Sequence, residues 1–186
     1  MLASGNTWES SVTEKGDSVP KTFTVSIVLE QITLTDAVVD RLLAALPDAI
    51  PAQIGGVVTV TAPVDASDPE AAAFELIDAV DRALPQAVVC RLDQDLVAIP
   101  DIAVRTNRSR ESVRLLVEGK RGPGGFPGPI GTVGDGIRIW PWASVLEWFA
   151  HRLGADLGEH AIPPEVAAAV DARLAARQPR SAARAS

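Results

Sequence analysis

The chain has 186 residues, of which 47% are hydrophobic, which suffices for one or two domains with a packed core and excludes a globally disordered chain. Its single cysteine, Cys90, excludes an intramolecular disulfide and a thiolate-rich zinc site. The formal net charge of −7 excludes a uniformly basic chain, yet residues 96–152 carry eight basic against five acidic side chains. A local basic region of this kind is the electrostatic signature of phosphate binding.

Residues 1–20 are rich in Ser, Thr, Gly and charged residues, and we expect them to form a flexible N-terminus. They show no basic segment followed by an apolar stretch, so the sequence predicts no signal peptide. No apolar run reaches the roughly 18 to 20 residues that a membrane-spanning helix needs. We therefore expect no membrane partner.

Residues 21–94 alternate between strand and helix patterns and predict the first domain. Apolar and polar residues alternate over 23–30, which is typical of a half-buried strand. Thr35 is placed to cap a first helix, and Ser67 or Asp68 to cap a second. The expected elements are strands over residues 23–30, 49–53, 57–61 and 87–92 and helices over residues 36–46 and 69–84. This β-α-β-β-α-β order predicts a ferredoxin-like sandwich, in which two helices cover one face of an antiparallel sheet.

Residues that would carry catalysis are scarce. The chain has two histidines, no tyrosine and no serine or cysteine in a recognisable nucleophile setting. Cys90 ends an apolar run, and we expect it to be a small buried hydrophobic residue. Asp93 and Asp95 lack a third ligand, so we interpret them as linker residues rather than as a metal site or an acid–base pair. We expect no enzyme, no catalytic or metal-binding residue and no cofactor.

Residues 95–153 predict a DNA-binding domain of the winged helix-turn-helix class. A first helix is expected over 99–106, and Asn107 tolerates the left-handed backbone with which a chain leaves a helix. Ser109 is placed to cap a second helix that ends at Glu118. Two short helices joined by a tight turn are typical of a helix-turn-helix. The first helix is expected to face inward through Ile102, Ala103 and Val104.

The wing is predicted in the segment after these helices. Residues 119–129 are too rich in Gly and Pro for a helix or a central strand, so they predict a loop. The apolar segments 130–133 and 137–140 flank glycines that permit a tight turn, which predicts a β-hairpin. We expect Trp140 and Trp148 to pack in the core of this domain rather than to stack on bases.

Basic and hydroxyl side chains of this domain indicate contacts with double-stranded DNA. An arginine near the N-terminus of the second helix can bond guanine O6 and N7, while serine hydroxyls hold phosphate. Basic residues of the loop and the wing would clamp phosphates. The alternative is an ordinary surface helix whose polar side is solvated. The candidate DNA-binding residues are Arg108, Ser109, Arg110, Ser112, Arg114, Lys120, Arg121 and Arg138.

Four segments of this domain carry a resemblance to a known family. The pattern Phe126-Pro127-x-Pro129-Ile130, then Arg138 with Trp140, then Val145 with Trp148, resembles the MerR-related winged helices of AlpA-type phage regulators and excisionases. Residues 109–114 followed by 119–127 resemble small actinobacterial DNA-binding proteins of the same type. The resemblance covers residues 95–150 and implies a winged helix that binds double-stranded DNA.

Residues 154–186 are predicted to hold a C-terminal helix and a flexible tail. The alanine-rich helix, over 165–177, either packs on the body or pairs between subunits. Residues 178–186 predict a flexible basic end. The expected fold class is therefore α+β, with a ferredoxin-like sandwich, a MerR- or excisionase-like winged helix and a C-terminal helix.

Together these features predict a cytoplasmic, nucleoid-associated protein that binds specific DNA sequences as a transcriptional regulator. Because a lone winged helix covers few base pairs, we expect a homodimer, held chiefly by residues 22–93. The sequence leaves two alternatives open. One is a phage-type architectural or excisionase factor, and the other is an antitoxin-like or adaptor protein whose acidic first domain binds a protein partner.

Overall fold

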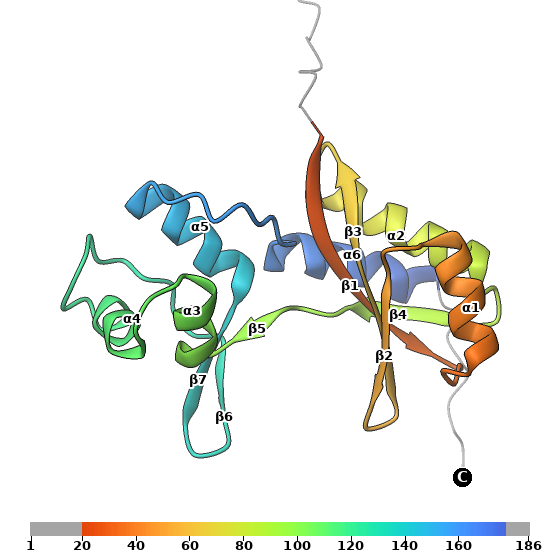
Figure 1. Ribbon diagram of the computed structural model, residues 1–186, viewed down its shortest axis with the longest axis horizontal. Helices are drawn as coiled ribbons and strands as arrows, with labels where there is room; N and C mark the ends of the chain where they lie inside the picture. The colour runs from red at the N-terminus through yellow and green to blue at the C-terminus, as the bar shows by residue number, and fades with distance from the viewer. Residues whose placement is uncertain (1–19, 178–186) are drawn as a thin grey trace, which may run out of the picture.

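The protein has a mixed α+β fold. The computed structural model describes residues 20–177, which contain six helices and two antiparallel sheets (Figure 1). No helix within this range is long and apolar enough to cross a membrane. The first half comprises the strands β1 (Lys21–Glu30), β2 (Ile50–Ile54), β3 (Val57–Ala66) and β4 (Val88–Leu92) and the helices α1 (Asp36–Ala45) and α2 (Pro69–Ala83).

The four strands of the first half form a sheet in the order β2-β3-β1-β4 with antiparallel neighbours. Alternate residues of β1, such as Phe23, Val25 and Ile27, are buried in the core that this face shares with α1 and α2. This alternation is the pattern expected of a half-buried strand. β3 runs to Ala66, beyond the predicted end, because it stays paired with β1 along its whole length.

Both helices of the first half begin at side-chain caps. The hydroxyl of Thr35 accepts a hydrogen bond from the Val38 amide at the start of α1. Of the two residues predicted to cap α2, Asp68 is the cap, and its carboxylate accepts from the Ala71 amide at 2.8 Å. This bond to the charged form lowers the pKa of Asp68.

The second half has a core of its own. Its elements are β5 (Leu96–Val97), α3 (Ile99–Arg105), α4 (Arg110–Val117), β6 (Gly131–Val133), β7 (Ile137–Pro141) and α5 (Trp142–Leu153). The strands form a small sheet in the order β5-β7-β6. Ile102 and Ala103 are buried as predicted, but Val104 is 81% exposed. The prediction for Val104 was wrong because each residue of a helix is turned by about 100° from the one before, which places Val104 on the side of α3 away from Ile102.

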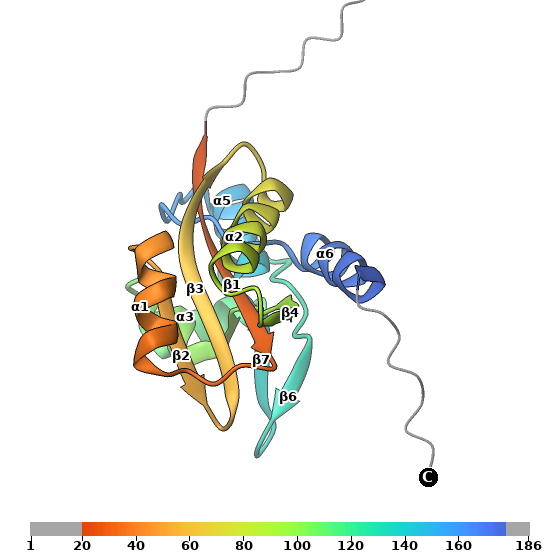
Figure 2. The same ribbon diagram turned by 90° about the vertical axis from the view of Figure 1, so that its right-hand side faces the viewer.

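The C-terminal helix, α6 (Pro164–Arg177), returns to the first half. Ala167, Val170 and Leu174 are buried in the same core as β1 and α2, and Figure 2 shows α6 beside α2 and β4. The Asp171 carboxylate accepts a hydrogen bond from the Leu92 amide at 2.7 Å. Since β4 is an edge strand, this bond satisfies a donor that would otherwise face solvent. Of the two alternatives for this helix, it packs on the body.

The segment between α5 and α6 joins the two halves. The Thr24 amide of β1 donates to the His160 carbonyl at 2.9 Å, and Thr24 forms a parallel bridge with Ala161. The Trp142 indole N–H donates to the Glu159 carboxylate at 2.7 Å. The segment is therefore bonded to the first sheet on one side and to α5 on the other. Figure 1 shows the sheet between α1 and α2 on its one side and the second half on the other.

Candidate nucleic-acid interface

The turn between α3 and α4 is built from local bonds. Asn107 has a φ of +50°, the left-handed conformation predicted for it. The Arg108 amide donates to the Ala103 carbonyl at 2.8 Å, which satisfies the end of α3. The Ser109 hydroxyl accepts from the Ser112 amide at 3.1 Å and caps α4. Ser109 therefore positions the start of α4, and the amide of Ser112 already has a partner.

Arg110 lies in the first turn of α4 with its side chain exposed. The opposite side of the helix is buried through Val113 and Leu116. Within residues 20–177, no hydrogen bond, ion pair or ring contact engages the Arg110 guanidinium. Its five N–H donors are available to a partner from outside the chain.

Arg114, by contrast, is held on its own helix. Its guanidinium forms two bonds to Glu111, at 2.8 and 2.6 Å, and one to Glu118 at 2.6 Å. These bonds raise the pKa of Arg114 and lower the pKa of Glu111, and the bonds of Glu118 with Lys120 and with Arg114 lower the pKa of Glu118. Lys120 extends the cluster through an ion pair with Glu118 at 2.8 Å. We call Glu111, Arg114, Glu118 and Lys120 the α4 ion-pair cluster, and it brings together two of the predicted DNA-binding residues.

The loop after α4 folds back onto the helix. The amides of Lys120 and Arg121 both donate to the Leu115 carbonyl, at 2.9 and 3.1 Å. Gly122 has a φ of +79°, and a Cβ at this position would lie 2.8 Å from a methyl carbon of Leu116. Only glycine allows this backbone to approach the buried leucine so closely. The Arg121 side chain is exposed, and no residue of the described range bonds it.

Aromatic side chains fix the Gly/Pro-rich loop to the second core. The Trp140 indole N–H donates to the Pro127 carbonyl at 2.9 Å, and that of Trp148 to the Gly124 carbonyl at 3.1 Å. The Phe126 ring lies 4.9 Å from the Trp148 ring, centroid to centroid. Trp140 is fully buried and Trp148 is 5% exposed, so both pack in the core as predicted. Neither ring is free to stack on a base.

Two further candidate arginines lie over aromatic rings. Arg138, on β7, is placed 5.5 Å above Trp140, and Arg108 is placed 5.5 Å above Phe149. A guanidinium over a ring keeps its N–H groups in its own plane, where they remain able to bond. Within the described residues, no contact joins Arg108 or Arg138 to Arg110 or Arg121. The structure therefore does not bring these four candidate residues into contact.

Arg105, another arginine of this half, was not among the predicted site residues. Arg105 forms a bidentate ion pair with Asp95 and lies 4.9 Å from the Trp142 ring centroid. The bond with Asp95 raises the pKa of Arg105. Asp95 was interpreted as a linker residue, and no local pattern shows that a helix ten positions later turns back to it.

Known proteins give no further guide. Comparisons of the chain with protein-family models, with curated proteins and with solved structures give no match.

In residues 20–177, no group of three His, Cys, Asp or Glu side chains is placed to hold a metal ion. The Cys90 thiol donates to the Val28 carbonyl at 3.4 Å, and burial raises the pKa of this thiol.

Proposed function

We propose that this chain binds specific sequences of double-stranded DNA through its second half and acts as a transcriptional regulator. In this proposal α3 and α4 form a helix-turn-helix, the β6–β7 hairpin is its wing, and the first half is a ferredoxin-like domain. Arg110 enters the major groove, and Arg121 and Arg138 lie on phosphates.

One observation carries the proposal. Arg110 and Arg121 project from α4 and the loop behind it, exposed and without an intramolecular partner in residues 20–177. An ion pair with a phosphate or a bidentate bond to guanine would satisfy them. Figure 1 places α4 at the end of the molecule away from α1 and α2, where a duplex can approach without meeting the acidic first half. Residues 1–95 carry fifteen acidic against five basic side chains.

The test is selection of bound sequences from random duplex DNA at a stated salt concentration. We expect a defined consensus, and we expect Arg121→Ala to flatten the dependence of affinity on salt by about one unit of slope. Arg82→Ala is the matched control, because Arg82 is an exposed arginine on the far helix α2 and should leave binding unchanged. Recovery of no consensus, or equal effects of the two variants, contradicts the proposal.

We also propose that the protein is a homodimer joined through the first sheet. Ile50, Ile54 and Val57 are 68%, 80% and 46% exposed. Ile50 and Ile54 are paired in register with Thr61 and Val57, so the three apolar side chains share the face opposite α1 and α2. Pro51 denies a further strand one N–H donor, which favours pairing through this face rather than through the β2 edge.

A second copy is the occupant that a symmetric regulator requires, because two half-sites multiply the specificity of one winged helix. Light scattering on the full chain tests it. We expect Ile50→Lys with Ile54→Lys to give a monomer, because the pair places two charges in a desolvated contact. Val104→Lys, which charges an exposed valine of α3, should leave the dimer intact. A monomeric parent protein refutes the dimer.

A further inference from the structure

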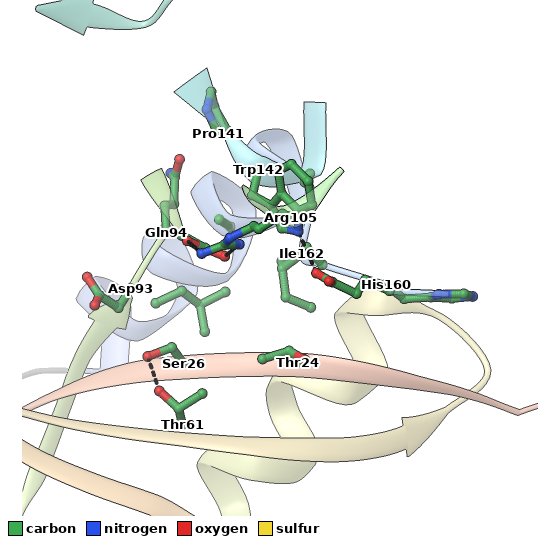
Figure 3. Close-up of a pocket in the computed structure, with 16 residues that line it drawn as sticks. Thr24, Ser26, Thr61, Asp93, Gln94, Arg105, Pro141, Trp142, His160 and Ile162 are labelled. Atoms are coloured by element: carbon green, nitrogen blue, oxygen red, sulfur yellow. Dashed lines mark hydrogen bonds and ion pairs between the residues drawn. The ribbon is translucent and has the colours of Figure 1, made fainter. Parts of the chain in front are cut away.

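A pocket of about 440 Å³ lies between the two halves, and no function proposed above uses it. Figure 3 shows Thr24, Ser26 and Thr61 on the strands along one side and Trp142 with Arg105 opposite. The linker after β4 and the segment that joins α5 to α6 close the remaining sides. The volume falls within the range of about 300 to 1,000 Å³ that is usual for small-molecule sites.

The sheet contributes a polar wall to this pocket. Ser26 and Thr61 share a hydrogen bond of 2.8 Å between their hydroxyls, and both residues are half-buried. Each hydroxyl keeps bonding capacity beyond this one contact. The helix-free face of a sheet is usually either polar and open to water or apolar and covered. Here the part of that face around Ser26 and Thr61 is polar and partly covered by the other half, whereas Ile50, Ile54 and Val57 of the same face are exposed. The polar part can form hydrogen bonds with a polar ligand.

The charge of the lining is negative. Three carboxylates, those of Asp93, Asp95 and Glu159, face a single guanidinium, that of Arg105. Asp95 forms an ion pair with Arg105, and Asp93 forms one with Arg91 at 3.0 Å. Glu159 is exposed and accepts the neutral indole N–H of Trp142. Arg105 lies near enough to interact with Glu159 electrostatically, but no cation of residues 20–177 forms an ion pair with it. The pocket therefore offers one carboxylate that has no ion-pair partner within the described residues.

We propose that this pocket binds a small organic amine that also carries hydroxyl groups, of one or two sugar-sized rings. The ammonium lies beside Glu159, and the hydroxyls of the ligand exchange hydrogen bonds with Ser26 and Thr61. Both halves supply contacts, so the ligand fixes the first sheet against α5. The binding step is independent of the proposed DNA binding.

Calorimetric titration of the full chain without DNA tests the inference. The probes are glucosamine and its β-1,4-linked dimer. Glucose and cellobiose are the neutral analogues of the same shape, and glucuronate is the anionic control. We expect an amine to bind at least about tenfold more tightly than its neutral partner, since a charge-assisted hydrogen bond contributes that much. Equal binding of the neutral sugars, or no binding of either amine up to about 10 mM, overturns the proposal.

Two variants locate the site. Glu159→Gln keeps an acceptor for Trp142 but removes the charge, so it should abolish the preference for the amine and leave weak binding of the neutral partner. Thr61→Val keeps the shape of the side chain and should weaken all the sugars by a few-fold. Glu147→Gln, at an exposed carboxylate of α5 outside the pocket, is the matched control. If Glu159→Gln and Glu147→Gln behave alike, the ammonium is not at this site.

Discussion

Arg110 and Arg114 lie about one turn apart on α4 but have different surroundings. Arg110 has no partner in residues 20–177, whereas Arg114 is bonded to Glu111 and Glu118. An arginine that is already paired has to exchange its carboxylates before it reaches a base or a phosphate. Within the proposed function we therefore expect Arg110 to contact bases and Arg114 chiefly to neutralise the acidic residues of its own helix.

The first prediction separates these roles. Arg110→Ala should weaken binding to the selected sequence by about 1 to 3 kcal/mol and change binding to a scrambled duplex little, because bidentate base contacts carry discrimination. Arg114→Ala should weaken binding to both duplexes alike, since it leaves two carboxylates uncompensated near phosphate. Fluorescence anisotropy with the two duplexes at one salt concentration measures this. A loss of discrimination in Arg114→Ala alone would exchange the assignments.

The second prediction concerns Glu118, which binds both Arg114 and Lys120. Glu118→Gln releases Lys120 and one N–H of Arg114, so any duplex should bind a few-fold more tightly and with a salt dependence steeper by up to about one unit. Glu75→Gln, at an exposed position of α2, makes the same change in net charge. If both variants tighten binding equally, the effect belongs to the net charge and not to the α4 ion-pair cluster.

At the scale of elements, the loop after α4 depends on one glycine. Gly122→Ala places a Cβ against Leu116 in a backbone with positive φ, and we expect a loss of about 1 to 3 kcal/mol in stability. Because the same loop presents Arg121, DNA affinity should fall as well. Gly128→Ala is the control, since a Cβ there meets open space and its φ is not positive. Urea unfolding of both variants, followed by tryptophan fluorescence, measures the difference.

Elements whose signals are local could be predicted from the sequence. The caps at Thr35 and Asp68 and the alternation of β1 depend on neighbours within a few residues. The same holds for the α3–α4 turn, whose Asn107 and Ser109 act as expected. The candidate DNA-binding residues were chosen in the same way, by side-chain type and place on a helix, and their role stays a prediction.

Elements that depend on distant partners could not be predicted. β5 is a strand only because Leu96 and Val97 pair with β7. A stretch of two residues carries no pattern that predicts this pairing. Asp171 meets Leu92 across 79 positions of the chain. The pocket likewise gathers the strands, the linker and the returning segment, which no single stretch of sequence brings together. The pairing of Arg114 was within reach, because carboxylates three and four positions away on a helix are its neighbours.

At the scale of the molecule, the chain leaves its first core, builds a second and returns to the first. Leu174 lies in the core of the first half, although it follows the whole second half in sequence. The segment that carries the chain back is bonded to Thr24 on one side and to Trp142 on the other. Two segments of the chain therefore connect the halves, the linker after β4 and the segment between α5 and α6. Hydrogen bonds join the halves as well. We expect the two cores to unfold as one cooperative unit.

The last prediction uses the distribution of tryptophans to test this coupling. Trp140, Trp142 and Trp148 all lie in the second core, so in a Trp8→Phe background fluorescence reports on that core alone. Leu174→Ala removes buried volume from the first core and should cost about 2 to 5 kcal/mol. If the halves are coupled, this variant lowers the urea midpoint seen by fluorescence as much as the midpoint seen by circular dichroism. Val145→Ala, within the second core, is the positive control. A fluorescence midpoint that stays at the parent value in Leu174→Ala, while circular dichroism shows an early transition, would mean that the second half folds independently of the helix that follows it.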